Sequence, residues 1–372
     1  MARQISAIDL HFLVKELKDA LIGAKIDSIY NPEQKELILQ VHVPNAGKKI
    51  LRILPTMMYL TDHKEKYEEP SGFCQFLRKS IANARVKDIT QLGSEMIILF
   101  LLEKKEGFFK LVTEFFNKGN VLLLDDKDIV LAATDYPRQK DRTIRPKAPY
   151  TYPKREFNVF EIKKNELKKI VKESNKDKLV TCIATELGIG GLYSEEICVG
   201  LEKNKLPKEL DDEEISKIYR NLANLFGKSL TPKIFLDSQQ KLVDFAPVTL
   251  RVYEHTDYEV LSFKDYCSLL EELQVRGLLE EKKPSKAKAE KEKLEKRIEA
   301  QQKAISSLEK EEISLKEKAE LIYNNYQLVN DILKQVNDAV KKIGFAEVEK
   351  KLKGHKTIKA VDGKEKTVTV NV

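Results

Sequence analysis

SKAKAEKEKLEKRIEAQQKAISSLEKEEISLKEKAELIYNNYQLVNDILKQVNDAVKKI, residues 285–343, carries apolar side chains at alternating steps of three and four residues. Gln301 and Glu312 interrupt this seam, and no Gly or Pro falls between Pro284 and Gly344. A sustained 3.5-residue repeat predicts a long helix with a narrow apolar seam that packs against a partner helix. Helical throughout, it would span about 90 Å. The seam consists of Leu294, Ile298, Ile305, Leu308, Leu315, Ala319, Ile322, Tyr326, Val329, Leu333, Val336, Val340 and Ile343.

The chain contains no second heptad run that could pair with this helix. Either its two halves fold back on each other or the partner lies outside this chain, for example in a second copy, and we favour an outside partner. The alternative is a plain solvated helix. The sequence ends within a strand-like run, Val368 to Val372, from which we expect that the natural protein continues.

Composition permits several domains and does not fix a partner. The 372 residues, 42% of them hydrophobic, can fill the cores of two to four domains. A net charge of +7 allows an acidic partner such as nucleic acid without requiring one. Neither a signal peptide nor an 18-residue apolar run is present, so we expect a cytoplasmic protein with no membrane partner.

The four cysteines, Cys74, Cys182, Cys198 and Cys267, are scattered and form no CxxC pair. They predict reduced thiols rather than a disulfide framework or a zinc site.

Residues 1–175 predict a mixed or antiparallel sheet with helices packed against it. An opening helix over 6–22 would bury Leu10, Leu13, Val14, Leu17 and Leu21, and Asp9 in its first turn either stabilises the helix N-terminus or serves a site. A second helix is expected over Gly72–Ala84. The expected strands are Lys25–Tyr30, Glu36–Val43, Lys49–Leu54, Arg85–Gln91, Met96–Glu103, Phe109–Phe116 and Asn120–Asp125.

The most basic stretch runs from Arg138 to Arg155. Prolines keep it out of a helix, and Tyr136, Tyr150 and Tyr152 are interleaved with its cations. Cations beside aromatic rings on an extended loop suit an RNA backbone and an unstacked base, and the alternative is a solvated loop. The cations are Arg138, Lys140, Arg142, Arg145, Lys147, Lys154 and Arg155.

Residues 176–228 predict a separate helical unit. A helix over Leu179–Leu187, a turn over 188–191 and a second helix over Ser194–Gly200, capped by Ser194, resemble a helix-hairpin-helix. Glu195 and Glu196 would lie in the first turn of that second helix and repel a phosphate. We therefore interpret the unit as a packing module.

Residues 229–280 are expected to complete or bridge the N-terminal region. Strands over Lys233–Asp237, Lys241–Phe245 and Leu250–Tyr253 would precede a helix from Ser262 to about Leu279. Beyond the long helix we expect a short helix and a hairpin around Asp362-Gly363.

Familiar catalytic motifs are missing: there is no P-loop, HExxH, GxSxG or Rossmann fingerprint, and the five histidines are dispersed. This favours a binding protein without a cofactor over an enzyme.

An ordered set of short motifs resembles the NFACT family, in an archaeal form. The resemblance covers essentially the whole chain. Each motif alone is weak, and their order is specific. The motifs are Ser6-x-x-Asp9-Leu10, Phe73-Cys74-x-x-Leu77-Arg78-Lys79, Gln91-x-Gly93, Lys118-Gly119-Asn120, Asp141-Arg142-x-Ile144, Tyr150-x-x-Pro153, Glu186-Leu-Gly188-Ile-Gly190-Gly191 and Glu320-Leu-Ile-Tyr323.

The resemblance implies an α+β architecture with an NFACT-N domain over 1–175 and a helix-hairpin-helix domain over 176–228. It also implies a coiled-coil/middle domain over 281–372, with the family's C-terminal domain and the returning helix of the coil missing. NFACT-N resembles the N-terminal domain of formamidopyrimidine-DNA glycosylases.

The resemblance further implies a function in ribosome-associated quality control. Family members bind large ribosomal subunits obstructed by peptidyl-tRNA, recruit tRNA and promote template-free C-terminal tailing, largely with alanine. The implied partners are therefore the large subunit with its rRNA, peptidyl-tRNA and tRNA, alanine tRNA among them.

Three family positions have counterparts in this sequence. Asp9 matches an aspartate needed for tRNA engagement, and the family's Asp-Arg pair corresponds to Glu95 and Met96. Met96 lacks the cation, which puts tailing by this route in doubt. The expected tRNA- or RNA-binding set is Asp9, Arg78, Lys79, Glu95, Met96, Lys118, Asn120, Arg138, Lys140, Arg142 and Arg145.

The sequence speaks against two other functions and leaves a third open. A glycosylase would need an N-terminal proline amine as its nucleophile, whereas Ala2 stands here. Fibronectin binding, described for some bacterial relatives, conflicts with the lack of an export signal. A general RNA-binding scaffold without tailing activity is the leading alternative.

Overall fold

The computed structural model describes residues 3–32, 35–63, 70–137, 142–153, 157–277, 286–352, 355–362 and 365–370. The chain divides into two units, Met1–Glu281 and Lys282–Val372. Each is described by itself.

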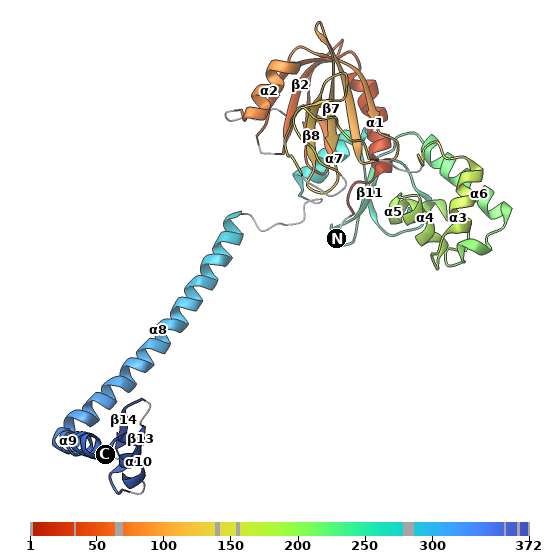
Figure 1. The fold of residues 1–372 in the computed structure, drawn as a ribbon. Helices are drawn as coiled ribbons and strands as arrows, with labels where there is room; N and C mark the ends of the chain where they lie inside the picture. The colour runs from red at the N-terminus through yellow and green to blue at the C-terminus, as the bar shows by residue number, and fades with distance from the viewer. Residues whose placement is uncertain are drawn as a thin grey trace. The chain divides into compact units, whose positions relative to one another are not determined.

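The first unit is built on a nine-stranded sheet in the order β4-β3-β2-β1-β5-β6-β7-β8-β9 (Figure 1). Every pair of neighbours is antiparallel, which confirms the α+β prediction in its antiparallel form. Two strands, β4 and β9, were not expected. The strands are β1 (Lys25–Tyr30), β2 (Leu37–Val43), β3 (Gly47–Ile53), β4 (Met58–Thr61), β5 (Arg85–Gln91), β6 (Ile97–Lys104), β7 (Gly107–Glu114), β8 (Asn120–Leu124) and β9 (Val130–Ala133).

The sheet is an internal duplication that the sequence analysis missed. Helix α1 (Ala7–Leu21) precedes β1–β4, and α2 (Gly72–Ile81) precedes β5–β8. Where the halves meet, the Ile26 amide donates to the Ala84 carbonyl and the Val86 amide donates to the Ala24 carbonyl, both at 2.9 Å. Both β1 and β5 carry a bulge after the second residue. Ala24-Lys25-Ile26 thus corresponds to Ala84-Arg85-Val86, and this repeat was readable in the sequence.

Helix α1 is buried on two sides because it lies between two cores. The predicted apolar face, for example Leu13 and Leu17, packs against the sheet together with α2 and α7 (Tyr266–Val275). Ile8 and Phe12 on another side join a second core that includes α3–α6 (Figure 1). Polar residues on this helix near its N-terminus are therefore enclosed.

The helical unit beside α1 begins earlier than expected. It contains α3 (Lys164–Glu173), α4 (Leu179–Glu186), α5 (Gly190–Ile197), the 3₁₀ turn η1 (Pro207–Glu209) and α6 (Asp212–Gly227). The expectation that Ser194 caps the second hairpin helix is wrong: α5 starts at Gly190, and the Ser194 hydroxyl donates to the Gly191 carbonyl within the helix at 2.7 Å. Glu195 and Glu196 consequently lie beyond the first turn, so the argument that they repel a phosphate there fails.

A three-stranded sheet follows, in the order β11-β10-β12. The expected strand Leu250–Tyr253 is wrong, because a 3₁₀ turn, η2 (Arg251–Tyr253), forms there. The expected cap at Ser262 is also wrong: Ser262 pairs with Lys233 in a strand, and Asp265 caps α7 by accepting from the Ser268 amide at 2.8 Å. The strands are β10 (Lys233–Leu236), β11 (Leu242–Ala246) and β12 (Glu259–Ser262).

The second unit contains α8 (Lys286–Asn324), α9 (Tyr326–Ile343), α10 (Phe345–Leu352) and the antiparallel hairpin of β13 (Ile358–Asp362) and β14 (Thr367–Val370). The prediction of one continuous helix is wrong. At Asn325 the backbone leaves helical geometry, with ψ at 27°, and α9 leaves the end of α8 in another direction (Figure 1).

The two parts of the apolar seam have different surroundings. In α9, Val336 is buried against Val348 and Ile358 of the small domain. In α8, Ile305, Leu308 and Leu315 are 55%, 63% and 57% exposed. Pairing or self-association through α8 stays a prediction. Within the described residues, no helix has both the length and the apolar character needed to cross a bilayer.

Candidate nucleic-acid interface

Asp9, the residue that matches a family aspartate, lies at a fully buried junction. Its carboxylate has no exposed surface and accepts from Arg3 through Nη1 and Nη2 at 2.5 and 2.9 Å. Ser6 donates to it through its amide and its hydroxyl, and the Asp9 amide donates to the Ser6 hydroxyl; the two amide bonds form the capping box of α1. Two tyrosines complete the shell: Tyr193 of α5 donates at 2.6 Å and Tyr266 of α7 at 3.2 Å.

Arg3 extends this junction to β11. Its Nε donates to Asp244 at 2.8 Å, its Nη2 donates to the Phe245 carbonyl at 2.7 Å, and its guanidinium lies 4.0 Å from the centre of the Phe245 ring. Tyr253 donates to the other oxygen of Asp244 at 2.6 Å. One cation therefore serves two carboxylates. We call Arg3, Asp9, Tyr193, Asp244, Tyr253 and Tyr266 the Asp9 junction.

The protonation states follow from burial and charge. Burial alone would raise the pKa of Asp9, but the charge of Arg3 and the hydrogen bonds from Arg3, Ser6 and Tyr193 outweigh it and lower the pKa below 3.8. Burial, followed by the charge of Asp9, raises the pKa of Tyr193 and Tyr266. The carboxylate stays ionised and the phenols stay donors, so Asp9 has no free face for RNA.

His11, two residues after Asp9 in α1, makes the stability of the fold depend on pH. Its ring stacks on Phe160 with centroids 4.2 Å apart, and burial, then the charge of Lys15, lowers its pKa to about 4. Above an unfolded-state pKa of 6.5 it is neutral in both states. Between pH 6.5 and about pH 4, His11 binds a proton in the unfolded chain but stays neutral in the folded chain. The free energy of unfolding therefore falls by roughly 2–3 kcal/mol over this range.

Urea unfolding at about pH 7 and pH 4.5 measures this effect, with His11→Gln as the comparison. The variant should lack that part of the acid destabilisation. Equal acid sensitivity in both proteins would contradict the prediction.

The turn between β5 and β6 lies against the start of α1. Gln91 donates through Nε2 to the Ala7 carbonyl at 2.9 Å and to the Glu95 carbonyl at 3.0 Å. Glu95 is partly exposed, whereas Met96 packs against the core of the sheet. The structure thus brings this turn and the helix that carries Asp9 together, with an apolar contact at Met96.

Arg142, expected to contact RNA, is mostly buried and is bound by other groups of the protein. Its side chain is 15% exposed and pairs with Glu114, which is 4% exposed. Nε donates to the Thr151 carbonyl at 2.9 Å, and the guanidinium lies 4.8 Å from the centre of the Tyr150 ring. Tyr150 donates to the same Glu114 at 2.6 Å. This part of the basic stretch covers the outer face of β6–β9 rather than presenting a free cation.

Lys118 lies near Thr134 and Asp135, which follow β9. Asn120 is buried and bonds to both Thr134 and Asp135, which anchors this segment beside the turn before β8. Lys118 in the adjacent turn is exposed, and its charge contributes to lowering the pKa of Asp135 after the larger influence of Lys35. Gly119 needs its positive φ of 65°, and a Cβ there would lie 2.5 Å from the Pro55 Cα. Asn120 therefore supports the surface that Lys118 presents.

The remaining predicted cations differ in exposure. Arg78 donates to the Ile29 carbonyl at 2.7 Å and lies over the Tyr30 ring, while Lys79 and Arg145 are exposed. Arg138 and Lys140 lie outside the described residues. The exposed cations of the predicted set that the structure describes are Lys79, Lys118 and Arg145.

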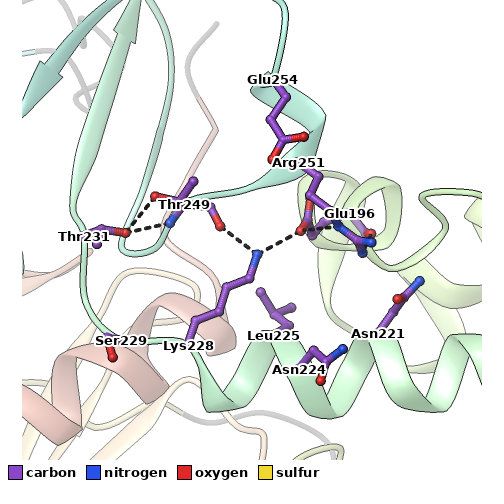
Figure 2. Close-up of a pocket in the computed structure, with 10 residues that line it drawn as sticks. All are labelled: Glu196, Asn221, Asn224, Leu225, Lys228, Ser229, Thr231, Thr249, Arg251 and Glu254. Atoms are coloured by element: carbon purple, nitrogen blue, oxygen red, sulfur yellow. Dashed lines mark hydrogen bonds and ion pairs between the residues drawn. The ribbon is translucent and has the colours of Figure 1, made fainter.

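A pocket of about 510 Å³ lies where α5, the end of α6 and η2 meet (Figure 2). Glu196, 2% exposed, accepts from Lys228 at 3.0 Å, from Arg251 at 3.3 Å and from the Val252 amide at 3.1 Å. Lys228 also donates to the Thr249 carbonyl at 2.7 Å. Glu196 thus ties α5 to the segment after β11.

Sequence reasoning missed Arg3, Tyr193, Glu196 and Tyr266. The partners of Tyr193, Glu196 and Tyr266 are far away along the chain, and no local spacing marks the pair of Arg3 and Asp9. Across the described part of the chain, no group of three or more His, Cys, Asp or Glu side chains could hold a metal ion.

Fold and site define an α+β protein in which a duplicated antiparallel sheet carries a helical unit held by buried ion pairs. Two solved structures share the fold. The N-terminal part of the fibronectin/fibrinogen-binding protein from Streptococcus suis superposes with a TM-score of 0.59 at 20% identity, covering 73% of this chain and all of that one. The fibrinogen-binding protein from Staphylococcus aureus gives 0.56 at 18%, covering 71% and 97%.

The chain belongs to the NFACT family: the family pattern described as NFACT N-terminal and middle domains matches residues 6–365. It is 30% identical over 317 residues to the archaeal Rqc2 homolog aRqcH of Methanocaldococcus jannaschii, covering 81% of this chain and 46% of that protein. Ribosome quality control complex subunit 2 of Saccharomyces cerevisiae is 34% identical over 135 residues, covering 36% and 13%. Human ribosome quality control complex subunit NEMF is 23% identical over 231 residues, covering 60% and 21%. The chain therefore spans about half, or less, of the length of these relatives.

Proposed function

We propose that this chain is part of a cytoplasmic ribosome-associated quality control factor. It binds large ribosomal subunits obstructed by peptidyl-tRNA, engages tRNA, alanine tRNA among them, and supports template-free C-terminal tailing. The observation that carries this proposal is the family membership over residues 6–365, together with relatives named as ribosome quality control subunits. The chain acts as a binding factor and not as an enzyme.

Exposed cations supply the RNA contact in this proposal. Lys118 is exposed near Asp135, and Arg145 is exposed within the basic stretch. Such side chains neutralise phosphates and release counterions, so their contribution depends on salt. Arg142, held by Glu114, supports the loop instead.

Reversing these two charges should weaken RNA binding. The double variant Lys118→Glu, Arg145→Glu is expected to lower the affinity for large subunits or tRNA about tenfold or more. It should also reduce the slope of log affinity against log salt by about one per lost phosphate contact. Filter binding or co-sedimentation over a salt series measures both quantities.

Lys127→Glu is the matched control for this variant. Lys127 is exposed after the other end of β8 and should change binding little. An unchanged affinity and salt slope in the double variant would remove this surface from the proposal.

A second candidate function is an RNA-binding scaffold without tailing activity. The packing of Met96 against the sheet core favours it, because the family's cation is absent at that position. Met96→Arg in a chain carrying all family domains should raise tailing if this position limits it.

A further inference from the structure

The Asp9 junction joins segments that are remote in the sequence. Tyr193 and Tyr266 are 184 and 257 residues from Asp9, and Asp244 is 241 residues from Arg3. The junction therefore connects the start of the chain, α1, α5, β11 and α7. It lies where the sheet and the helical unit meet at α1.

Apolar and polar contacts act differently at this boundary. The core shared by Ile8, Phe12 and the helices α3–α6 attracts without direction, so it holds the two parts together but does not fix one orientation. Charge-assisted hydrogen bonds have narrow distance and angle requirements. The bond from Tyr193 to Asp9 connects α5 to α1 directly, at 2.6 Å.

We propose that Asp9 is a positioning residue: as the shared acceptor of Arg3, Tyr193 and Tyr266, it fixes how the helical unit, residues 157–228, is placed on the sheet. Resting on the function proposed above, the inference adds that RNA binding depends on Asp9 through this placement and not through contact. RNA reaches the exposed cations of the sheet, such as Lys118, and those at and after the start of α3, Lys163, Lys164 and Lys169, together when that placement is held.

This inference predicts that a residue unable to touch RNA reproduces the effect of changing Asp9. Tyr193 is 1% exposed, and Tyr193→Phe removes the bond to Asp9 without altering any charge or surface. Asp9→Asn removes the ion pair with Arg3. Thr113→Val is the matched control, because it deletes a buried hydroxyl that donates to the Ile98 carbonyl at 3.2 Å inside the sheet.

The test measures placement and binding separately. Spin labels on Lys127→Cys, in the turn between β8 and β9, and on Glu213→Cys of α6, both at exposed positions, report a distance distribution by pulsed electron resonance; the four native cysteines are buried. In Asp9→Asn and Tyr193→Phe this distribution should broaden or shift, and tRNA affinity should fall about three- to tenfold for Tyr193→Phe and further for Asp9→Asn. Thr113→Val should leave both unchanged.

Three results would each contradict one claim: positioning by Asp9, the dependence of RNA binding on placement, or the proposed function. Wild-type distances and affinity in Tyr193→Phe, with affinity lost in Asp9→Asn, would overturn positioning. Altered distances with wild-type affinity in both variants would overturn the link from placement to RNA. Altered distances in a chain whose wild type binds no tRNA would refute the proposed function and leave the placement role of Asp9 standing.

Discussion

Arg3→Met lowers the free energy of unfolding by about 3–5 kcal/mol at neutral pH. The substitution keeps a long side chain that can still pack on Phe245, but it removes the one cation between Asp9 and Asp244. Asp9 has no exposed surface, so its charge is then buried without a counter-ion, and only the hydrogen bonds from Ser6, Tyr193 and Tyr266 are left. Chemical denaturation measures the loss, with Arg85→Met as a control, since Arg85 is exposed and donates to the Gly23 carbonyl rather than to a carboxylate.

The pH dependence of that loss identifies its cause. In the wild type the pKa of Asp9 is lowered, so its contribution is present above the ordinary value of 3.8 and is lost as the pH falls through the folded-state pKa. Without Arg3, burial dominates and raises the pKa of Asp9, so protonation relieves the variant. The deficit of Arg3→Met relative to the wild type should therefore shrink between about pH 7 and pH 4.5. His11 contributes equally to both proteins and cancels. A deficit that stays constant or grows in acid would contradict this account.

Glu196→Ala is expected to cost about 2–4 kcal/mol. It leaves Lys228, Arg251 and the Val252 amide without their shared acceptor, beside the pocket that Glu196 lines (Figure 2). Glu195→Ala next to it is the control. Its pair with Lys203 is exposed, at 42% for both side chains, and such pairs contribute about 0–1 kcal/mol. Equal losses in the two variants would show that burial of Glu196 does not matter.

Local patterns predicted most of the first unit. The apolar face of α1 and the strands β1, β5 and β6 depend on neighbours a few residues away, and the structure confirms them. Local residue types predicted the turns and helix caps less well, because some of these side chains bond to other groups than expected. Arg251 and Val252 form a 3₁₀ turn that is held by Glu196, and Ser194 bonds within its own helix.

The site was harder to predict because its partners are distant in sequence. Spacing alone could not show that Asp9 meets Arg3, Tyr193 and Tyr266, or that Arg142 is bound by Glu114. The sequence of a basic stretch shows how many cations are present, but not which of them form ion pairs inside the folded protein. The duplication relating Ala24-Lys25-Ile26 to Ala84-Arg85-Val86 was readable and would have placed the two helices and their strands in equivalent positions.

Co-sedimentation with large ribosomal subunits, with and without bound peptidyl-tRNA, over a salt series tests the central claim most directly. The quality-control function predicts a preference for obstructed subunits that persists at salt concentrations where non-specific binding is lost. Equal, steeply salt-dependent binding to both kinds of subunit would contradict it and leave an RNA-binding scaffold.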